Sequence, residues 1–214
     1  MKDLLIKKLV DIKEFTIGEY SIGNFELNAG EWVCLRQLPN DFSGAFRELL
    51  LLGVYESGGT KILDTLLEGL DKKKKQELRR QISYWPKNFV EFANENYIKS
   101  KQYLLNIDTG DTTVKGKHYL EHLMLRDDID VGIKNCIYAA LMNAPRLLII
   151  DEALDHLSAE QIDIVLSALQ RYSHQTGLAV VFFTESESIQ KRIKAREFAI
   201  DDQKNLVELM MYQV

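Results

Sequence analysis

The chain has 214 residues and a mass of 24.7 kDa, which fits a single α/β domain. Hydrophobic residues make up 46% of it and charged residues 28%, a composition that supports a packed core and argues against disorder. The formal net charge of −5 argues against non-specific binding to nucleic acid. Both cysteines lie in apolar stretches, so we expect free thiols in a reducing cytosol.

No stretch is apolar over the ~18–20 residues that a membrane-spanning helix needs. Residues 1–8 also lack the apolar core of a signal peptide. If the protein works at a membrane, another chain must therefore carry it there. The basic run 72–75, with Arg79 and Arg80, is interpreted as the solvated face of a helix.

The first half of the chain predicts β structure followed by a strand, a loop and a helix. Alternating apolar and polar residues over 3–35 predict strands, the last of which is the short buried strand 32–35. A loop is expected over 36–45 and a helix over 46–52, ending at Gly53. The stretch 64–80 is predicted to be mainly helical, and a strand over 81–85 is stopped by Pro86.

In the second half, helical and buried strand patterns alternate. A helix is predicted over 131–142, followed by the aliphatic strand 147–150. Ser158 and Gln161 have the spacing of a capping box for a helix that runs to about residue 172. A second buried strand over 179–183 and a closing hairpin over 198–209 complete the α/β pattern.

Two acids, Asp151 and Glu152, follow the strand 147–150 directly. In an open α/β sheet, ligands bind at the carboxyl ends of the strands. Paired carboxylates at that position typically hold a metal ion and orient water for phosphoryl transfer. The strand, loop and helix of residues 32–52 form the context in which a phosphate-binding loop occurs.

Taken in order, these pieces resemble the nucleotide-binding domain of ABC transporters over nearly the whole chain. Six stretches carry the resemblance: 30–35 before the Walker A loop, 53–62 after it, 77–86 before the Q-loop, 140–152 into Walker B, 179–184 before the switch histidine, and the hairpin 198–209. The resemblance implies an α/β fold with an ABC-type P-loop NTPase-like core, an antiparallel β part and a shortened helical subdomain at 89–135. We expect residues 1–214 to form one such domain.

The resemblance places the Walker A loop at residues 37–46, where the usual lysine position falls to Ser43 or Gly44. No lysine occurs from 36 to 60, and the loop instead carries Asp41 and Phe42. An acid repels phosphate, and a bulky ring blocks the close backbone approach that glycine allows. The residues left as candidates for nucleotide binding are Asn40, Ser43, Gly44 and Ala45, with Phe15 or Tyr20 to stack on adenine.

The other motif positions also lack the residues that the family uses there. The place of the signature motif carries three aspartates within 127–131, the Q-loop glutamine position carries Lys87, and the switch-histidine position carries Glu185. Only the Walker B acids Asp151 and Glu152 are intact. We therefore expect a pseudo-ATPase that does not depend on ATP, Mg²⁺ or another metal. On this view Asp151 hydrogen-bonds or caps a neighbouring loop and Glu152 is a solvated acid.

The function implied by the resemblance is that of a structural or regulatory component of a membrane transporter complex. The chain would be cytoplasmic and would be held at the inner face of a membrane by a partner. Its partners would be a membrane permease subunit and either an active ABC ATPase or a second copy of this chain. Two alternatives stay open. One is a divergent ATPase in which Arg36 or Arg47 replaces the lysine, and the other is a soluble interaction module that works without a transporter.

A separate pattern, His118-Tyr-Leu-Glu-His122, matches the inverted zinc-peptidase motif H-x-x-E-H. On a helix it would place two imidazoles and a carboxylate on one face. Such a short pattern arises often by chance, and no third ligand is evident in the sequence. We therefore do not expect a zinc site.

Overall fold

The computed structural model describes residues 7–53, 59–89 and 131–209. The strands in this part of the chain are β1 Lys8–Ile17, β2 Tyr20–Asn28, β3 Trp32–Arg36, β4 Lys61–Ile62, β5 Thr65–Leu66, β6 Ile82–Trp85, β7 Leu147–Asp151, β8 Ala179–Thr184, β9 Arg196–Ile200 and β10 Leu206–Leu209. The helices are α1 Asn40–Leu50, α2 Lys72–Arg79, α6 Val131–Leu141, α7 Ala159–Thr176 and α8 Glu187–Gln190.

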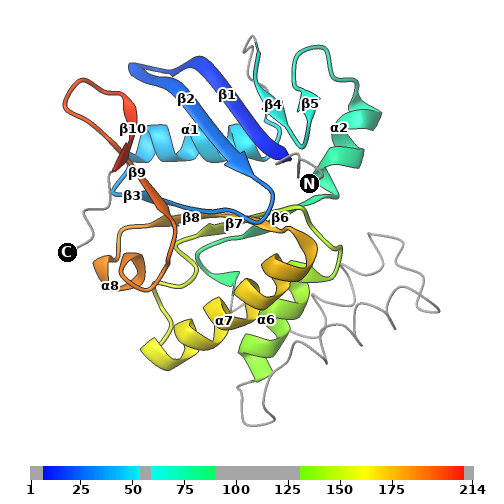
Figure 1. The fold of residues 1–214 in the computed structure, drawn as a ribbon, viewed down its shortest axis with the longest axis vertical. Coiled ribbons are helices and arrows are strands. Elements are labelled where there is room, and N and C mark those ends of the chain that lie inside the picture. Colours follow the sequence, from blue (N-terminus) through cyan, green and yellow to red (C-terminus); the bar gives the residue numbers. More distant parts are fainter. Residues whose placement is uncertain (1–6, 54–58, 90–130, 210–214) are drawn as a thin grey trace, which may run out of the picture.

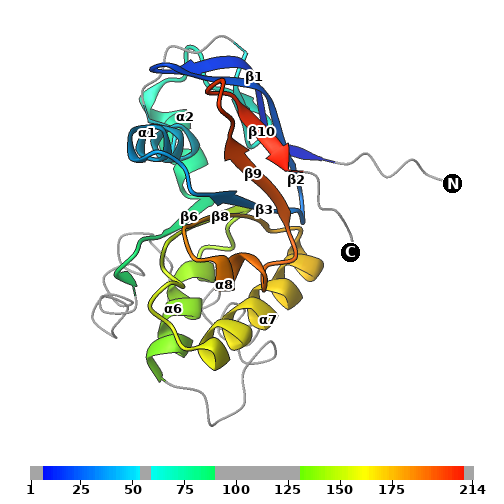
Figure 2. The ribbon, with the colours of Figure 1, turned by 90° about the vertical axis from the view of Figure 1, so that its left-hand side faces the viewer.

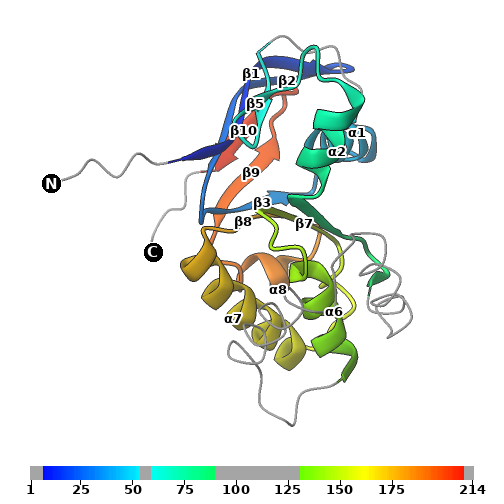
Figure 3. The ribbon, with the colours of Figure 1, turned by 90° about the vertical axis from the view of Figure 1, so that its right-hand side faces the viewer.

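The strands form two sheets that lie in different layers. The larger sheet has the order β10-β9-β3-β8-β7-β6, and the smaller one the order β2-β1-β4-β5. Figure 1 shows α1 and the smaller sheet on one side of the larger sheet, with α6 and α7 on the other. Figures 2 and 3 show the same layering from two further directions. The predicted α/β class with an antiparallel β part is confirmed.

The larger sheet is parallel from β9 to β6, and only β10 runs antiparallel to its neighbour. Parallel strands are covered on both faces and therefore read as continuous apolar runs. Every residue of β7 and β8 is buried. Along β7, Leu147 and Ile149 face the core shared with α1, while Leu148 and Ile150 face the core shared with α6 and α7. The strand 147–150 was thus correctly predicted.

The helix α1 begins at Asn40, six residues earlier than predicted, so the loop between β3 and α1 is only residues 37–39. The prediction gave weight to the turn-forming residues of 40–44. The structure instead follows the helical spacing of the apolar side chains, because Phe42, Phe46, Leu49 and Leu50 recur along one face and are all fully buried.

The predicted helix over 64–80 is wrong in its first half. Strands β4 and β5 form a hairpin there, with Ile62 paired with Thr65. The two residues between them, Leu63 and Asp64, have φ of +53° and +64°. Positive φ at both central residues defines the turn that matches the twist of a two-residue hairpin. Only the shorter helix α2 follows, and the side chain of Asp71 caps it.

The capping box of α7 is confirmed. The Gln161 amide donates to the Ser158 hydroxyl at 3.3 Å, and the Ser158 amide donates to Gln161 Oε1 at 2.9 Å. The helix continues to Thr176, beyond the predicted end. Gly177 then terminates it with φ +74°, the left-handed conformation that glycine adopts without a steric penalty.

Several predictions fall on residues that the structure does not describe. These are most of the helical subdomain at 89–135, the signature position at 127–130 and the motif from His118 to His122. The last part of the predicted subdomain, residues 131–135, is described and lies in α6. Within the described ranges, no helix is both long and apolar enough to cross a lipid bilayer.

We predict that Phe42→Ala lowers the free energy of unfolding by about 3–4 kcal/mol, because it removes a fully buried ring from the first turn of α1. Urea denaturation of the variant measures this loss. Asn40→Ala, at an exposed position in the same turn, is the matched control and should change stability little. A loss below about 1 kcal/mol for Phe42→Ala would place residue 42 in an exposed loop and contradict the early start of α1.

Candidate functional site

Asp151 is the last residue of β7, and its side chain is 10% exposed. It forms an ion pair with the guanidinium of Arg47, which comes from α1. The hydroxyl of Tyr84, on β6, donates a second hydrogen bond to the same carboxylate oxygen at 2.6 Å. One nearly buried carboxylate thus joins three elements that lie far apart in the sequence.

The pairing of β6 with β7 explains why these groups meet. Tyr84 lies opposite Ile149, two residues before Asp151, so the side chains of Tyr84 and Asp151 lie on the same face of the sheet. Helix α1 covers this face and brings Arg47 to it. Burial and the hydrogen bond to Asp151 raise the pKa of Tyr84 above its ordinary value, so the phenol stays a proton donor at neutral pH.

Glu152 also forms an ion pair within the chain. The ammonium of Lys87, just beyond β6, lies 2.6 Å from Glu152 Oε2, and the Lys87 side chain is 55% exposed. This hydrogen bond raises the pKa of Lys87. The backbone of Glu152 has φ +51°, an uncommon value for a residue with a side chain, and its N–H donates to the carbonyl of Phe183 at 2.9 Å. The structure therefore brings the predicted positions 87, 151 and 152 together.

The carboxylate of Asp41 lies at the start of α1. Asp41 Oδ1 accepts a hydrogen bond from the N–H of Phe42 at 2.9 Å and lies 3.5 Å from the hydroxyl of Tyr20. The N–H groups at a helix N-terminus and the helix dipole favour negative charge, and this is how such termini bind phosphate. Here a carboxylate of the first turn takes that position.

The other candidate positions around α1 lie as follows. Asn40 is exposed at the helix start, and Ser43, Gly44 and Ala45 are half-buried within its first two turns. Phe15, on β1, is only 7% exposed and belongs to the core.

Tyr20, the alternative adenine-stacking candidate, is 9% exposed and packs edge-on against Phe42 with ring centroids 5.4 Å apart. Neither this ring nor that of Phe15 is open to solvent. The binding roles assigned to these residues stay predictions.

The remaining predicted positions lie at the ends of β3 and β8. Arg36, considered as a substitute for the lysine, forms an ion pair with Glu197 at 2.9 Å. Glu185 is exposed directly after β8. Asp155 accepts a hydrogen bond from the hydroxyl of Thr184 at 3.0 Å, and burial raises the pKa of Asp155 above its ordinary value.

In the described ranges, no group of three or more histidine, cysteine, aspartate or glutamate side chains is arranged to hold a metal ion. The acids at the end of β7 and the basic residues nearest to them are paired with one another. The arrangement stabilises the junction between α1, β6 and β7. It also keeps Asp151 and Glu152 charge-balanced without a ligand.

Comparison with known proteins adds three findings. No protein-family model matches the chain. The methionine import ATP-binding protein MetN of Lactobacillus johnsonii is 26% identical over 189 residues, which is 78% of this chain and 54% of that protein. The chain thus spans about half the length of this curated relative.

Solved structures agree over almost the whole chain. CbiO1 of Clostridium perfringens, part of an ABC transporter complex, has a TM-score of 0.60 at 16% sequence identity. The match covers 94% of this chain and 87% of the CbiO1 chain. An inward-facing transporter of the metal-chelate ABC type scores 0.64 at 18% identity, over 95% of this chain and 83% of its own. The chain has the fold of an ABC nucleotide-binding domain. The resemblance deduced from the sequence is confirmed.

Within this ABC fold, sequence reasoning missed two roles. Arg47 was considered only as a substitute for the Walker A lysine, whereas the structure pairs it with Asp151, at the position that the sequence predicts for Walker B. Tyr84 was not singled out at all. The sequence contained one indication that Arg47 belongs to the site. Arg47 lies one helical turn beyond Ser43 and Gly44, so it shares their side of the helix.

We predict that Arg47→Ala lowers the free energy of unfolding by about 2 kcal/mol. The variant leaves a nearly buried carboxylate without its cation. The loss is smaller than for a fully buried ion pair, because the Arg47 side chain is 30% exposed. Lys87→Ala, which breaks the more exposed pair with Glu152, is the matched control and should leave the melting temperature nearly unchanged. Equal losses in the two variants would contradict a special role for the Arg47–Asp151 pair.

Tyr84→Phe should lower the free energy of unfolding by about 1 kcal/mol at pH 7, because it removes a hydrogen bond to a charged group. The pKa of Tyr84 is raised in the folded protein, so its contribution is complete below pH ~10 and is lost as the pH rises further. Urea denaturation from pH 7 to pH 11 should therefore show a shallower alkaline loss for the variant. Parallel pH profiles for the two proteins would refute this assignment.

Proposed function

We propose that this chain is a non-catalytic ABC subunit that serves as a structural or regulatory component of a membrane transporter complex. One observation carries the proposal. The two acids that would serve Mg²⁺ in an ABC-type site are paired within the chain, Asp151 with Arg47 and Glu152 with Lys87. At the start of α1, where phosphate would bind, the carboxylate of Asp41 accepts a hydrogen bond from the N–H of Phe42.

The Walker B side of the site supports this proposal. In P-loop NTPases, the aspartate at this position helps to hold the Mg²⁺ that bridges the phosphates. Here a guanidinium and a phenol bind the carboxylate oxygen Oδ2 of Asp151. A divalent cation would have to displace Arg47 and leave its charge beside the metal, which is unfavourable at short distance.

The phosphate side supports it in the same way. Phosphate binding needs free N–H groups at the start of the helix and a nearby lysine or arginine. The sequence has no lysine from 36 to 60, Asp41 places a negative charge at the start of α1, and Phe42 fills the first turn with a buried ring. The residues present therefore do not fit a Mg²⁺-triphosphate.

The proposed partner is a membrane permease subunit, which would hold this chain at the inner face of a membrane. The similarity to MetN, a methionine import ATP-binding protein, and to CbiO1, part of an ABC transporter complex, supports this partner. The second cassette of the complex would be either an active ABC ATPase or another copy of this chain. With an active partner, this chain would contribute framework and contacts rather than turnover at its own Walker motifs.

The divergent ATPase is the competing function. It would need Arg36 or Arg47 to take over from the Walker A lysine. Arg36 lies 2.9 Å from Glu197, and Arg47 is bound to Asp151, so each guanidinium has a carboxylate partner within the fold. These pairings favour the non-catalytic function.

Calorimetric titration with Mg²⁺-ATP and a turnover assay separate the two functions. We expect no saturable heat up to about 1 mM nucleotide, which corresponds to binding weaker than about −4 kcal/mol. Hydrolysis by the purified chain should not exceed that of the buffer, and Glu152→Gln should leave this background unchanged. Turnover that Glu152→Gln abolishes would overturn the proposal and establish an ATPase.

Affinity purification from native membranes tests the transporter partnership separately. A tagged chain should retain an integral membrane permease in mild detergent, in amounts comparable to its own. A variant with Phe42→Asp, which should unfold the α1 region, serves as the negative control. Recovery of soluble proteins alone would favour an interaction module that works without a transporter.

A further inference from the structure

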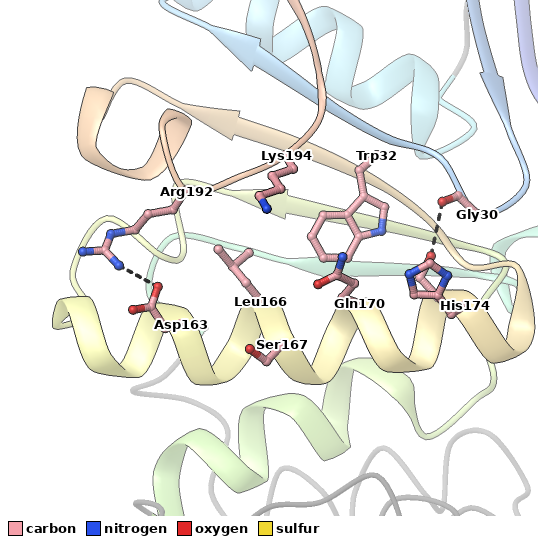
Figure 4. Close-up of a pocket in the computed structure, with 10 residues that line it drawn as sticks. Gly30, Trp32, Asp163, Leu166, Ser167, Gln170, His174, Arg192 and Lys194 are labelled. Carbon is pink, nitrogen blue, oxygen red and sulfur yellow. Dashed lines mark hydrogen bonds and ion pairs between the residues drawn. The ribbon is translucent and has the colours of Figure 1, made fainter.

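A surface groove of about 400 Å³ lies between α7 and the amino-terminal end of β3. Figure 4 shows its floor and walls, with the ring of Trp32 extending from β3 toward Gln170 on α7. Trp32 is the first residue of β3, whereas Asp151 is the last residue of β7 in the same parallel run of strands. The groove and the acids therefore lie at opposite edges of the sheet.

The groove has an aromatic wall. The Trp32 ring is half-buried and packs against Phe182, with centroids 5.4 Å apart at 54°. Leu166 adds an apolar contact surface from α7. A partly exposed indole inside a groove offers its face to a planar ring, because stacking removes apolar area from water without requiring hydrogen bonds.

One end of the groove is cationic. Lys194, in the segment before β9, is exposed and forms no ion pair with the described residues. Arg192, two residues earlier in the chain, also lines the groove and forms an ion pair with Asp163 of α7 at 2.6 Å. Figure 4 shows both cations on the side of the groove opposite α7. Because Asp163 balances Arg192, Lys194 adds one positive charge to the groove that no carboxylate among the described residues balances.

Polar side chains complete the α7 wall. Ser167, Gln170 and His174 recur at intervals of three and four residues, so they share the helix face that lines the groove. They supply a hydroxyl, an amide and an imidazole, all of which can form hydrogen bonds with ring nitrogens or hydroxyl groups.

We propose that this groove binds a small planar aromatic ligand that carries one anionic group, either a carboxylate or a phosphate. The ring stacks on Trp32, the anionic group binds Lys194, and Gln170 hydrogen-bonds the edge of the ring. The volume suits one such molecule, because ligand pockets start at roughly 300 Å³. The site does not rest on the proposed transporter function, since it uses no residue of the Walker motifs.

Intrinsic fluorescence provides a specific readout. The chain has two tryptophans, and the second, Trp85, is fully buried in the core shared with α6 and α7. Titration with phenyl phosphate or phenylacetate, both in the absence of divalent metal, should quench Trp32 in a saturable manner with an apparent Kd below about 1 mM. Phenol and inorganic phosphate test the ring and the anion alone, and each should bind at least about tenfold more weakly than phenyl phosphate. The ligand that binds more tightly shows whether the anion is a phosphate or a carboxylate.

Lys194→Ala should weaken the binding of the tighter ligand about tenfold, because it removes a charge-assisted hydrogen bond. Lys191→Ala is the matched control, since Lys191 is an exposed lysine of the same segment that does not line the groove. Calorimetry measures both variants, and Arg47→Ala should leave the affinity unchanged. No saturable quenching by either probe, or equal effects of the two lysine variants, would overturn the proposal.

Discussion

The ion pair between Arg47 and Asp151 is the interaction on which the rest of the site depends. Asp151 ends a strand whose residues are all buried, so its charge cannot be solvated freely and needs a partner. Arg47 supplies that partner from α1, and the hydroxyl of Tyr84 adds a hydrogen bond from the edge strand of the larger sheet. The pair thereby fixes the position of the helix that an ABC-type site would use to hold phosphate.

The same logic extends to the neighbouring charges. Lys87 balances Glu152, and Asp41 occupies the start of α1, where the helix dipole favours an anion. Asp151 and Glu152 therefore each have a partner of opposite charge, and Asp41 has a hydrogen-bond partner in the backbone of α1. A fold that keeps its shape without ligand is suited to a constant structural role, whereas an ATPase needs these groups to be available for exchange with substrate.

The sequence predicted those features that depend on local pattern. The aliphatic run 147–150 was predicted as a buried strand and forms one, and Ser158 with Gln161 forms the expected capping box. The start of α1 was misplaced because turn-forming residues surround Phe42, whose burial decides the conformation. The contact between Tyr84 and Asp151 was out of reach, because it depends on the register between two strands about 60 residues apart in the chain.

A crystal structure determined with saturating Mg²⁺ and a non-hydrolysable ATP analogue tests the central claim most directly. The account predicts that Arg47 still binds Asp151, that Asp41 remains at the start of α1, and that no triphosphate lies between α1 and the end of β7. A triphosphate bound at that position, with Mg²⁺ on Asp151 and Arg47 moved onto phosphate oxygens, would contradict the account.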